Sequence, residues 1–281
     1  MDLNEKKQLQ ITACKVRMGI VESTHSAKAG HPGGSLSATD MFTYLYFKEM
    51  NVDPQNPKAE NRDRFVLSKG HTAPGLYSTL AQRGFFPVED LKTLRRIDSY
   101  LQGHPNMTTV PGVDMSTGSL GQGISCAAGM ALGLKHQNNP ARVYTLLGDG
   151  EIQEGQVWEA CMLAAHYKLD NFVVIVDNNG LQIDGDISKV MSPYPIVDKL
   201  AAFGFHVEAI DGHDFDQIEA ALNTARATKG QPTAIVMKTT KGKDISFMEN
   251  DAGWHGKAPN DAEYEQAMNE LNAILSELEG K

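Results

Sequence analysis

The sequence predicts an α/β fold, a doubly wound, mainly parallel sheet with helices on both faces. One observation is that short apolar runs rich in β-branched residues alternate along the chain with longer segments of helical periodicity. A second is that two such runs, Val143–Leu147 and Asn171–Val176, flank the helical segment Gln156–Tyr167. A crossover helix of this length joins parallel strands, so the stretch predicts a βαβ unit.

The remaining elements follow from the same patterns. Helices are predicted over residues 3–27, 38–47, 74–83, 88–96, 124–136 (rich in small residues), 215–228 and 261–278 (amphipathic and acidic). A glycine-rich turn over residues 29–34 separates the first two helices. Strands are expected over residues 65–68, 205–210 and 233–238, and a further ordered segment over 195–202. Strands and helices thus alternate from the first strand onward.

Composition favours one large domain over residues 1–281. The chain is 41% hydrophobic and 22% charged, and no Pro/Ser-rich linker, repeat or low-complexity segment divides it. Its net charge is −9 and its basic residues form no stripe, which argues against a nucleic-acid partner. The N-terminus is charged and no apolar run is long enough to span a membrane. Three widely spaced cysteines favour reduced thiols, and we expect a cytoplasmic protein.

The central βαβ unit predicts a site for a metal ion bound to a diphosphate. Gly148-Asp149-Gly150 follows its first strand, and Asn178-Asn179 follows its second. Because parallel strands end at the same sheet edge, Asp149 and Asn179 can converge. With a backbone carbonyl such as that of Leu181, they offer the hard oxygen ligands that suit Mg²⁺ or Ca²⁺. Either turn alone is more often an ordinary connection; the two together, at this spacing, indicate the site.

Four histidines stand beside glycines in predicted turns: His31, His71, His104 and His255. An imidazole in such a turn is open to a ligand, and it can donate to phosphate or exchange protons near neutral pH. For any one of them alone, a surface or internally bonded loop histidine is the better interpretation.

In their order along the chain, these motifs resemble transketolases. The matching segments are Gly30-His31-Pro32-Gly33, Ser68-Lys69-Gly70-His71, Gly103-His104-Pro105, Ser116 to Gly123, Gly148-Asp149-Gly150 with Gln153-Glu154-Gly155, Asp177-Asn178-Asn179 through Gly185, and Trp254-His255-Gly256. The resemblance runs from about residue 12 to about residue 260. It implies a thiamine-diphosphate-dependent transferase that moves a two-carbon ketol unit from a ketose, or ketose phosphate, to an aldose.

The resemblance also assigns roles position by position. It implies that Mg²⁺ (or Ca²⁺ or Mn²⁺) is bound by Asp149, Asn179 and the Leu181 carbonyl. It implies cofactor contacts from His71, Gly118, Ser119, Leu120, Gly150, Glu151, Asn179 and His255. It implies that the donor sugar is oriented, and its proton transfers assisted, by His31, His104 and His255. Glu154 matches a glutamate of the subunit interface.

The chain departs from full-length transketolases because it ends at Lys281, before a pyrimidine-binding domain. The resemblance therefore implies the N-terminal subunit of a split enzyme, which is active only with a separate C-terminal chain. We expect a hetero-oligomer with two copies of each chain, acting on sugar phosphates, with a role in carbohydrate metabolism such as the pentose phosphate pathway. Two alternatives stay open: the α-subunit of a thiamine-diphosphate-dependent 2-oxo-acid dehydrogenase, and a noncatalytic metal- or nucleotide-binding module.

Overall fold

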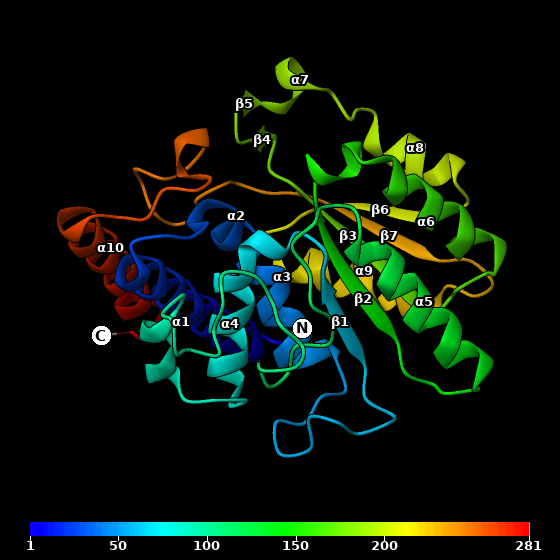
Figure 1. Cartoon of the computed structure of the whole chain (residues 1–281), viewed down its shortest axis with the longest axis horizontal. Coiled ribbons are helices and arrows are strands. Elements are labelled where there is room, and N and C mark those ends of the chain that lie inside the picture. The colour runs from blue at the N-terminus through cyan, green and yellow to red at the C-terminus, as the bar shows by residue number, and fades with distance from the viewer. Residues whose placement is uncertain (281) are drawn as a thin grey trace.

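The computed structural model describes residues 1–280, and its centre is a five-stranded sheet in which every pair of neighbouring strands is parallel (Figure 1). The spatial order is β1 (Arg64–Leu67), β2 (Val143–Gly148), β3 (Phe172–Asn178), β7 (Thr233–Lys238) and β6 (His206–Asp211). The chain thus adds strands in one direction as far as β3, then crosses to the far edge and returns. The predicted parallel α/β fold is confirmed.

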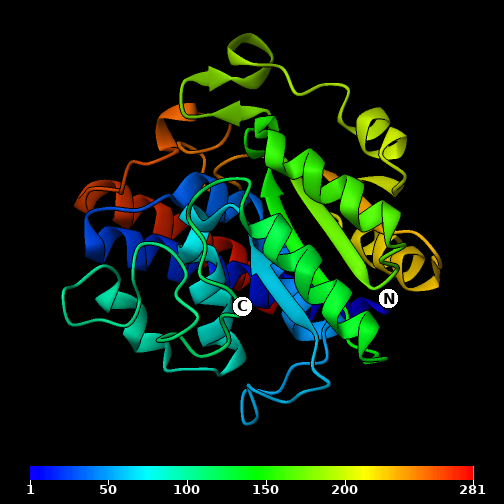
Figure 2. The same cartoon turned by 45° about the vertical axis from the view of Figure 1, so that its right-hand side comes forward.

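Helices cover both faces of this sheet (Figures 1 and 2). One face is covered by α5 (Gly123–His136), α6 (Gly155–His166) and α8 (Ile196–Ala202). The other is covered by α3 (Thr39–Tyr44), α4 (Ala73–Arg83) and α9 (Phe215–Ala227). The long helices α1 (Leu3–Ala27) and α10 (Asp261–Glu279) pack against each other outside this second layer.

The central strands are buried on both faces because their side chains alternate between the two layers. Tyr144 and Leu146 join the core cluster on the α3 and α9 side, whereas Val143 and Leu147 join the cluster under α5 and α6. All four are at most 1% exposed. Two buried faces explain why these strands read as continuous apolar runs rather than as an alternating pattern.

Three local predictions were wrong. The segment expected as one helix over 38–47 is divided into α3 and a π-helix (Leu45–Glu49). The glycine turn expected over 29–34 is partly helical, because α2 (Pro32–Ser37) begins within it. Pro32 supplies a suitable first helical residue, and a Cβ on Gly33 would lie 2.8 Å from the Trp254 carbonyl oxygen, so glycine permits this close packing. The helix expected over 88–96 is a 3₁₀ segment (Val88–Thr93), and it ends there because Leu94 has an extended ψ of 130° and Arg95 a left-handed φ of +61°.

Short elements frame the carboxyl edge of the sheet. They are the 3₁₀ turns at Gly70–Thr72, Glu151–Gln153 and Ala252–Trp254, a hairpin of β4 (Leu181–Gln182) and β5 (Gly185–Asp186), and α7 (Ile187–Val190). The sequence did not predict the hairpin, whose strands are too short to show a period. Within residues 1–280, no helix is long and apolar enough to cross a membrane.

Candidate thiamine diphosphate site

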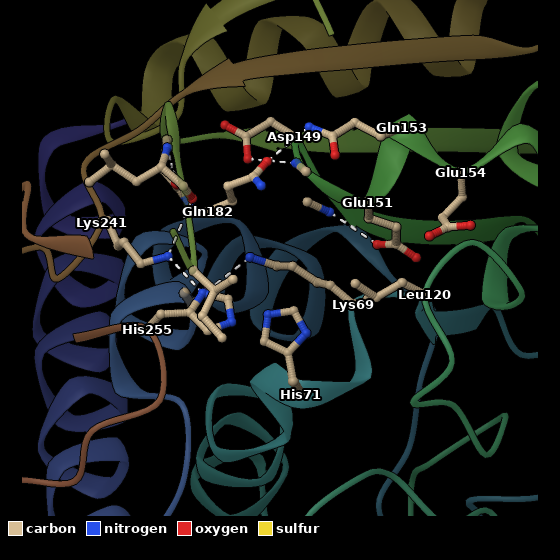
Figure 3. Close-up of a pocket in the computed structure, with 16 residues that line it drawn as sticks. Lys69, His71, Leu120, Asp149, Glu151, Gln153, Glu154, Gln182, Lys241 and His255 are labelled. Carbon is tan, nitrogen blue, oxygen red and sulfur yellow. Dashed lines mark hydrogen bonds between the residues drawn. The ribbon is translucent and has the colours of Figure 1, made fainter. Parts of the chain in front are cut away.

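A cavity of about 340 Å³ lies at the carboxyl ends of the sheet strands (Figure 3). The segments after β1, β2, β3 and β7 supply most of its lining: Lys69, His71, Gly148, Asp149, Gly150, Glu151, Asn179, Leu181, Lys241 and His255. Parallel strands that end at one edge bring Asp149, Asn179 and Leu181 together, as the sequence predicted. The carboxyl edge beside a change in strand order is where open α/β sheets bind ligands.

Asp149 is a buried carboxylate with little compensation for its charge. The residue is 2% exposed. The two oxygens of its carboxylate accept hydrogen bonds from the backbone N–H groups of Gly150 (2.9 Å) and Gly180 (2.6 Å). Burial, reinforced by the nearby charge of Asp177, raises the pKa of Asp149 to about 6. A buried anion of this kind is stabilised by a cation placed beside it.

Asn179 and Leu181 bring two further oxygens to the same cavity. The Asn179 amide oxygen accepts from the Leu181 N–H at 3.1 Å, and the Leu181 carbonyl accepts from the Lys241 ammonium at 3.4 Å. In residues 1–280, no group of three or more His, Cys, Asp or Glu side chains is placed to hold a metal ion. The predicted metal ligands are instead one carboxylate, one side-chain amide and one backbone carbonyl. Their oxygens suit a Mg²⁺ ion whose remaining ligands are water and phosphate.

In the sequence, the segment Lys241-Gly242-Lys243-Asp244 is equally compatible with a phosphate contact and with a solvated loop. In the structure, Lys241 lines the cavity. It is only 2% exposed, and its amine lies 3.2 Å from Nδ1 of His255. Burial, followed by the charge of Lys69, lowers the pKa of Lys241 to about 8. The solvated-loop interpretation is therefore wrong for Lys241, and a buried ammonium at the cavity wall suits an anionic ligand. The pattern Lys241-Gly242-Lys243 alone does not show which of its two lysines is buried.

Lys69, a further lining residue, is already paired. Its ammonium donates to the buried carboxylate of Asp177 and, at 3.0 Å, to the Gly34 carbonyl. Asp177 also accepts from the hydroxyls of Ser37 (2.6 Å) and Thr239, and despite burial these partners hold its pKa below the usual range. This network closes the floor of the cavity and orients the Asn179 amide, whose nitrogen donates to Asp177 at 3.3 Å.

Three of the four predicted histidines meet. The ring centroids of His31, His71 and His255 lie 5.1 to 5.4 Å apart, and His71 and His255 are stacked. Burial, with nearby positive charge, lowers their pKa values to about 4, 2 and 3 respectively, so all three are neutral at neutral pH. Nδ1 of His31 is buried with no hydrogen-bond partner, so it is free to serve a ligand. His71 and His255 line the cavity.

The other predicted residues lie next to this cavity or are used internally. Leu120 lines it, but Gly118 and Ser119 line a neighbouring hollow of about 230 Å³, and His104 lies against Gly118 rather than in the histidine group. A Cβ on Gly118, whose φ is +157°, would lie 3.0 Å from the His104 ring.

Glu151 lines the cavity, yet its carboxylate faces the protein. One oxygen accepts from the Ser68 hydroxyl (2.5 Å) and the Gly121 N–H (2.9 Å), and the other accepts from the Gly148 N–H (3.1 Å). Burial raises its pKa despite these bonds. Glu151 therefore ties the segment around Gly121 to the end of β2. Figure 3 shows it beside Leu120 in the cavity wall, just above that residue in the view.

Comparison with known proteins agrees with this site. Residues 8–273 match the family described as transketolase, thiamine diphosphate binding domain. The 6-deoxy-6-sulfo-D-fructose transketolase subunit SqwG of Clostridium sp. (strain MSTE9) is 43% identical, covering 94% of this chain and 96% of the relative. An apulose-4-phosphate transketolase subunit of Phocaeicola vulgatus is 42% identical, covering 96% of each.

Full-length transketolases match as well, but over part of their length. The human transketolase is 41% identical across this whole chain, which spans 44% of it. The crystal structure of the Campylobacter jejuni transketolase superposes with a TM-score of 0.88 at 33% identity, covering 99% of this chain and 46% of that one. This chain thus spans about half the length of those enzymes. With a cavity that offers hard oxygens for a cation and buried nitrogen donors for an anion, the chain belongs to the transketolase family and corresponds to its thiamine-diphosphate-binding domain.

Proposed function

We propose that this chain is the N-terminal subunit of a Mg²⁺-dependent transketolase that transfers a two-carbon ketol unit together with a separate C-terminal subunit. The observation that carries the proposal is the convergence of Asp149, Asn179, the Leu181 carbonyl and Lys241 in one cavity. Support also comes from relatives of the same length that are named transketolase subunits. The same names favour this function over a 2-oxo-acid dehydrogenase subunit or a noncatalytic module.

The cofactor would be held by its diphosphate end. Asp149, Asn179 and the Leu181 carbonyl would bind Mg²⁺ (or Ca²⁺ or Mn²⁺), and the ion would in turn bind the diphosphate oxygens. In the structure Lys241 donates to the Leu181 carbonyl. With the ion in place, this ammonium would turn to the diphosphate. A Cβ built on Gly150 would contact Gln182 at 3.5 Å, an ordinary van der Waals distance, so glycine leaves that part of the cavity free of a side chain.

The histidines would handle protons on the substrate side. When bound, thiamine diphosphate supplies an electron sink for the carbanion that carbon–carbon cleavage leaves. Cleavage and addition also need groups that take a proton from a sugar hydroxyl and return one to a carbonyl oxygen. His31 and His255 are neutral at neutral pH and so can accept a proton first. His104, which lies outside the histidine group, would contact the sugar nearer the cavity mouth.

The substrates would be sugars that carry an anionic group. The two subunit relatives are named for a sulfonated ketose and for a phosphorylated ketose, so the acidic group varies within this family. We propose a ketose phosphate donor and an aldose phosphate acceptor, as in the pentose phosphate pathway, and a complex with two copies of each chain. A cytoplasmic location stays a prediction from the sequence. The partner would activate the far end of the cofactor, and Glu154, exposed at the cavity rim, would face it.

Calorimetry tests the binding part of the proposal. Thiamine diphosphate is titrated into this chain mixed with the C-terminal chain, with Mg²⁺ and with EDTA. We expect saturable binding that requires Mg²⁺. Equal binding in EDTA, or none in either condition, would contradict the assigned site.

A further inference from the structure

The segment after β7 carries two residues of the cavity, Lys241 and His255. This segment, residues 239–255, contains only the short 3₁₀ turn Ala252–Trp254, so its path depends on contacts with other elements. Within it, the Asn250 N–H donates to the Lys241 carbonyl at 2.9 Å. Outside it, the Gly242 N–H donates to the Gly33 carbonyl at 3.0 Å.

His213 makes a second connection to this segment, from the end of β6. Its Nε2 lies 2.9 Å from the Thr240 backbone nitrogen, and its Nδ1 lies 2.7 Å from an Asp40 oxygen. A backbone N–H can only donate, so Nε2 must be the acceptor and must lack a proton. The imidazole proton is therefore on Nδ1, where it is donated to Asp40. This geometry selects the tautomer of His213 that carries its proton on Nδ1.

Arg17 completes the connection from α1. Its guanidinium donates to the same Asp40 oxygen at 2.7 Å, and its Nε lies 3.2 Å from the Asp244 carboxylate, on the far side of Lys241 along the chain. Arg17 is 3% and Asp40 is 5% exposed. Despite burial, Arg17 and His213 hold the pKa of Asp40 below its usual range, so the carboxylate stays ionised. The segment that carries Lys241 is thus held on both sides of that residue, at Thr240 and at Asp244.

We infer that Arg17, Asp40 and His213 are positioning residues, which place the Lys241 ammonium against the diphosphate site through Thr240 and Asp244. The inference deepens the proposed function and rests on it. None of the three residues lines the cavity of about 340 Å³. They act by fixing the backbone on either side of Lys241. A displacement of about 1 Å in a supporting element is enough to weaken ligand binding by the side chains that it carries.

His213→Phe and His213→Gln separate this role from simple packing. Phenylalanine keeps the ring shape and removes both hydrogen bonds, whereas glutamine keeps an amide that can accept from Thr240 and donate to Asp40. His206→Phe, at the start of β6, is the matched control, because the His206 ring contacts Glu208 and not this segment.

Hydrogen exchange followed by mass spectrometry gives a readout that needs no cofactor. In His213→Phe we expect faster exchange in the peptide that contains Thr240 to Asn250, with near wild-type exchange in His213→Gln and His206→Phe. Loss of one hydrogen bond predicts about tenfold faster exchange at the Thr240 amide. Unchanged exchange in His213→Phe would overturn the inference, whether or not the cofactor binds.

Thiamine diphosphate binding with Mg²⁺, in the mixture with the C-terminal chain, gives the second readout. We expect His213→Phe to raise the dissociation constant about tenfold, with kcat at saturating cofactor retained, and His213→Gln to restore affinity. Failure of the wild type to bind would contradict the proposed function and leave the exchange result to decide the positioning role. Wild-type binding with unchanged affinity in His213→Phe, or equal loss in His206→Phe, would overturn the positioning role alone.

Discussion

At the scale of single residues, the site is built from charged groups that are buried before any ligand is present. Asp149 and Lys241 are each 2% exposed. Burial raises the pKa of Asp149 and lowers the pKa of Lys241, which favours the neutral form of each side chain. Such groups cost stability unless a partner compensates them. A Mg²⁺ ion beside Asp149 and a diphosphate beside Lys241 would supply both partners. The two buried charges would therefore lower the stability of the free chain and raise its affinity for the cofactor.

Asp149→Asn tests the metal side of this arrangement. The amide keeps the size of the side chain but loses the charge that attracts Mg²⁺, so thiamine diphosphate with Mg²⁺ should bind at least about 100-fold more weakly. Calorimetry measures this affinity, and circular dichroism should show an unchanged fold. Asp184→Asn, in the exposed turn of the β4–β5 hairpin, is the control. Equal loss in both variants, or none in Asp149→Asn, would contradict the assignment.

The lowered pKa of His31 predicts a loss of stability in acid. The folded chain binds a proton on His31 only near pH 4, whereas the unfolded chain binds it near pH 6.5. The unfolded state therefore gains protons first as the pH falls, and the free energy of unfolding decreases between about pH 6.5 and pH 4. Relative to His31→Gln, the wild type should lose up to about 3 kcal/mol over this window.

Urea unfolding at pH 7 and at pH 4.5 measures that difference. His136→Gln, at the exposed end of α5, serves as the control and should follow the wild type. An identical pH dependence in His31→Gln and wild type would show that His31 is not held neutral by the fold.

At the scale of elements, the sequence predicted long periodic segments well and short ones poorly. The helices α1 and α10 and the strands β2 and β3 agree with their predicted bounds to within a residue or two. The π-helix Leu45–Glu49, the 3₁₀ turn Val88–Thr93 and the β4–β5 hairpin were missed. Segments this short span about one period, so tertiary contacts rather than pattern decide their form.

The same contrast holds in the site. Asp149, Asn179 and Leu181 follow predictable strands, so their convergence could be inferred from topology. Lys241 lies in an irregular segment whose path depends on distant contacts with α1, α3 and the end of β6. No local pattern could place it in the cavity.

Gly242→Ala tests how strictly the segment after β7 is fixed. Gly242 has a φ of +77°, and a Cβ there would lie 2.2 Å from the Met248 carbonyl oxygen. We expect a loss of about 2 kcal/mol or more in unfolding free energy and weaker cofactor binding, because Lys241 is the adjacent residue. Gly230→Ala, at φ +73° with no atom within 4 Å, isolates the cost of the left-handed backbone alone. Urea unfolding with the same cost in both variants would contradict a tightly fixed segment.

At the scale of the whole molecule, the proposed function has this chain hold one end of the cofactor and a second chain activate the other end. Its described residues offer oxygens that suit a cation and buried nitrogens that suit a diphosphate, and it spans about half the length of the full-length transketolases that it matches. A split site of this kind predicts that neither chain alone is catalytic, since the reacting groups are brought together only in the complex.

Ketol transfer between a ketose phosphate and an aldose phosphate, measured for each chain alone and for the mixture, tests this claim most directly. We expect transfer only in the mixture, and only with both thiamine diphosphate and Mg²⁺. Transfer by this chain alone, or transfer by the mixture that survives removal of thiamine diphosphate, would contradict the account.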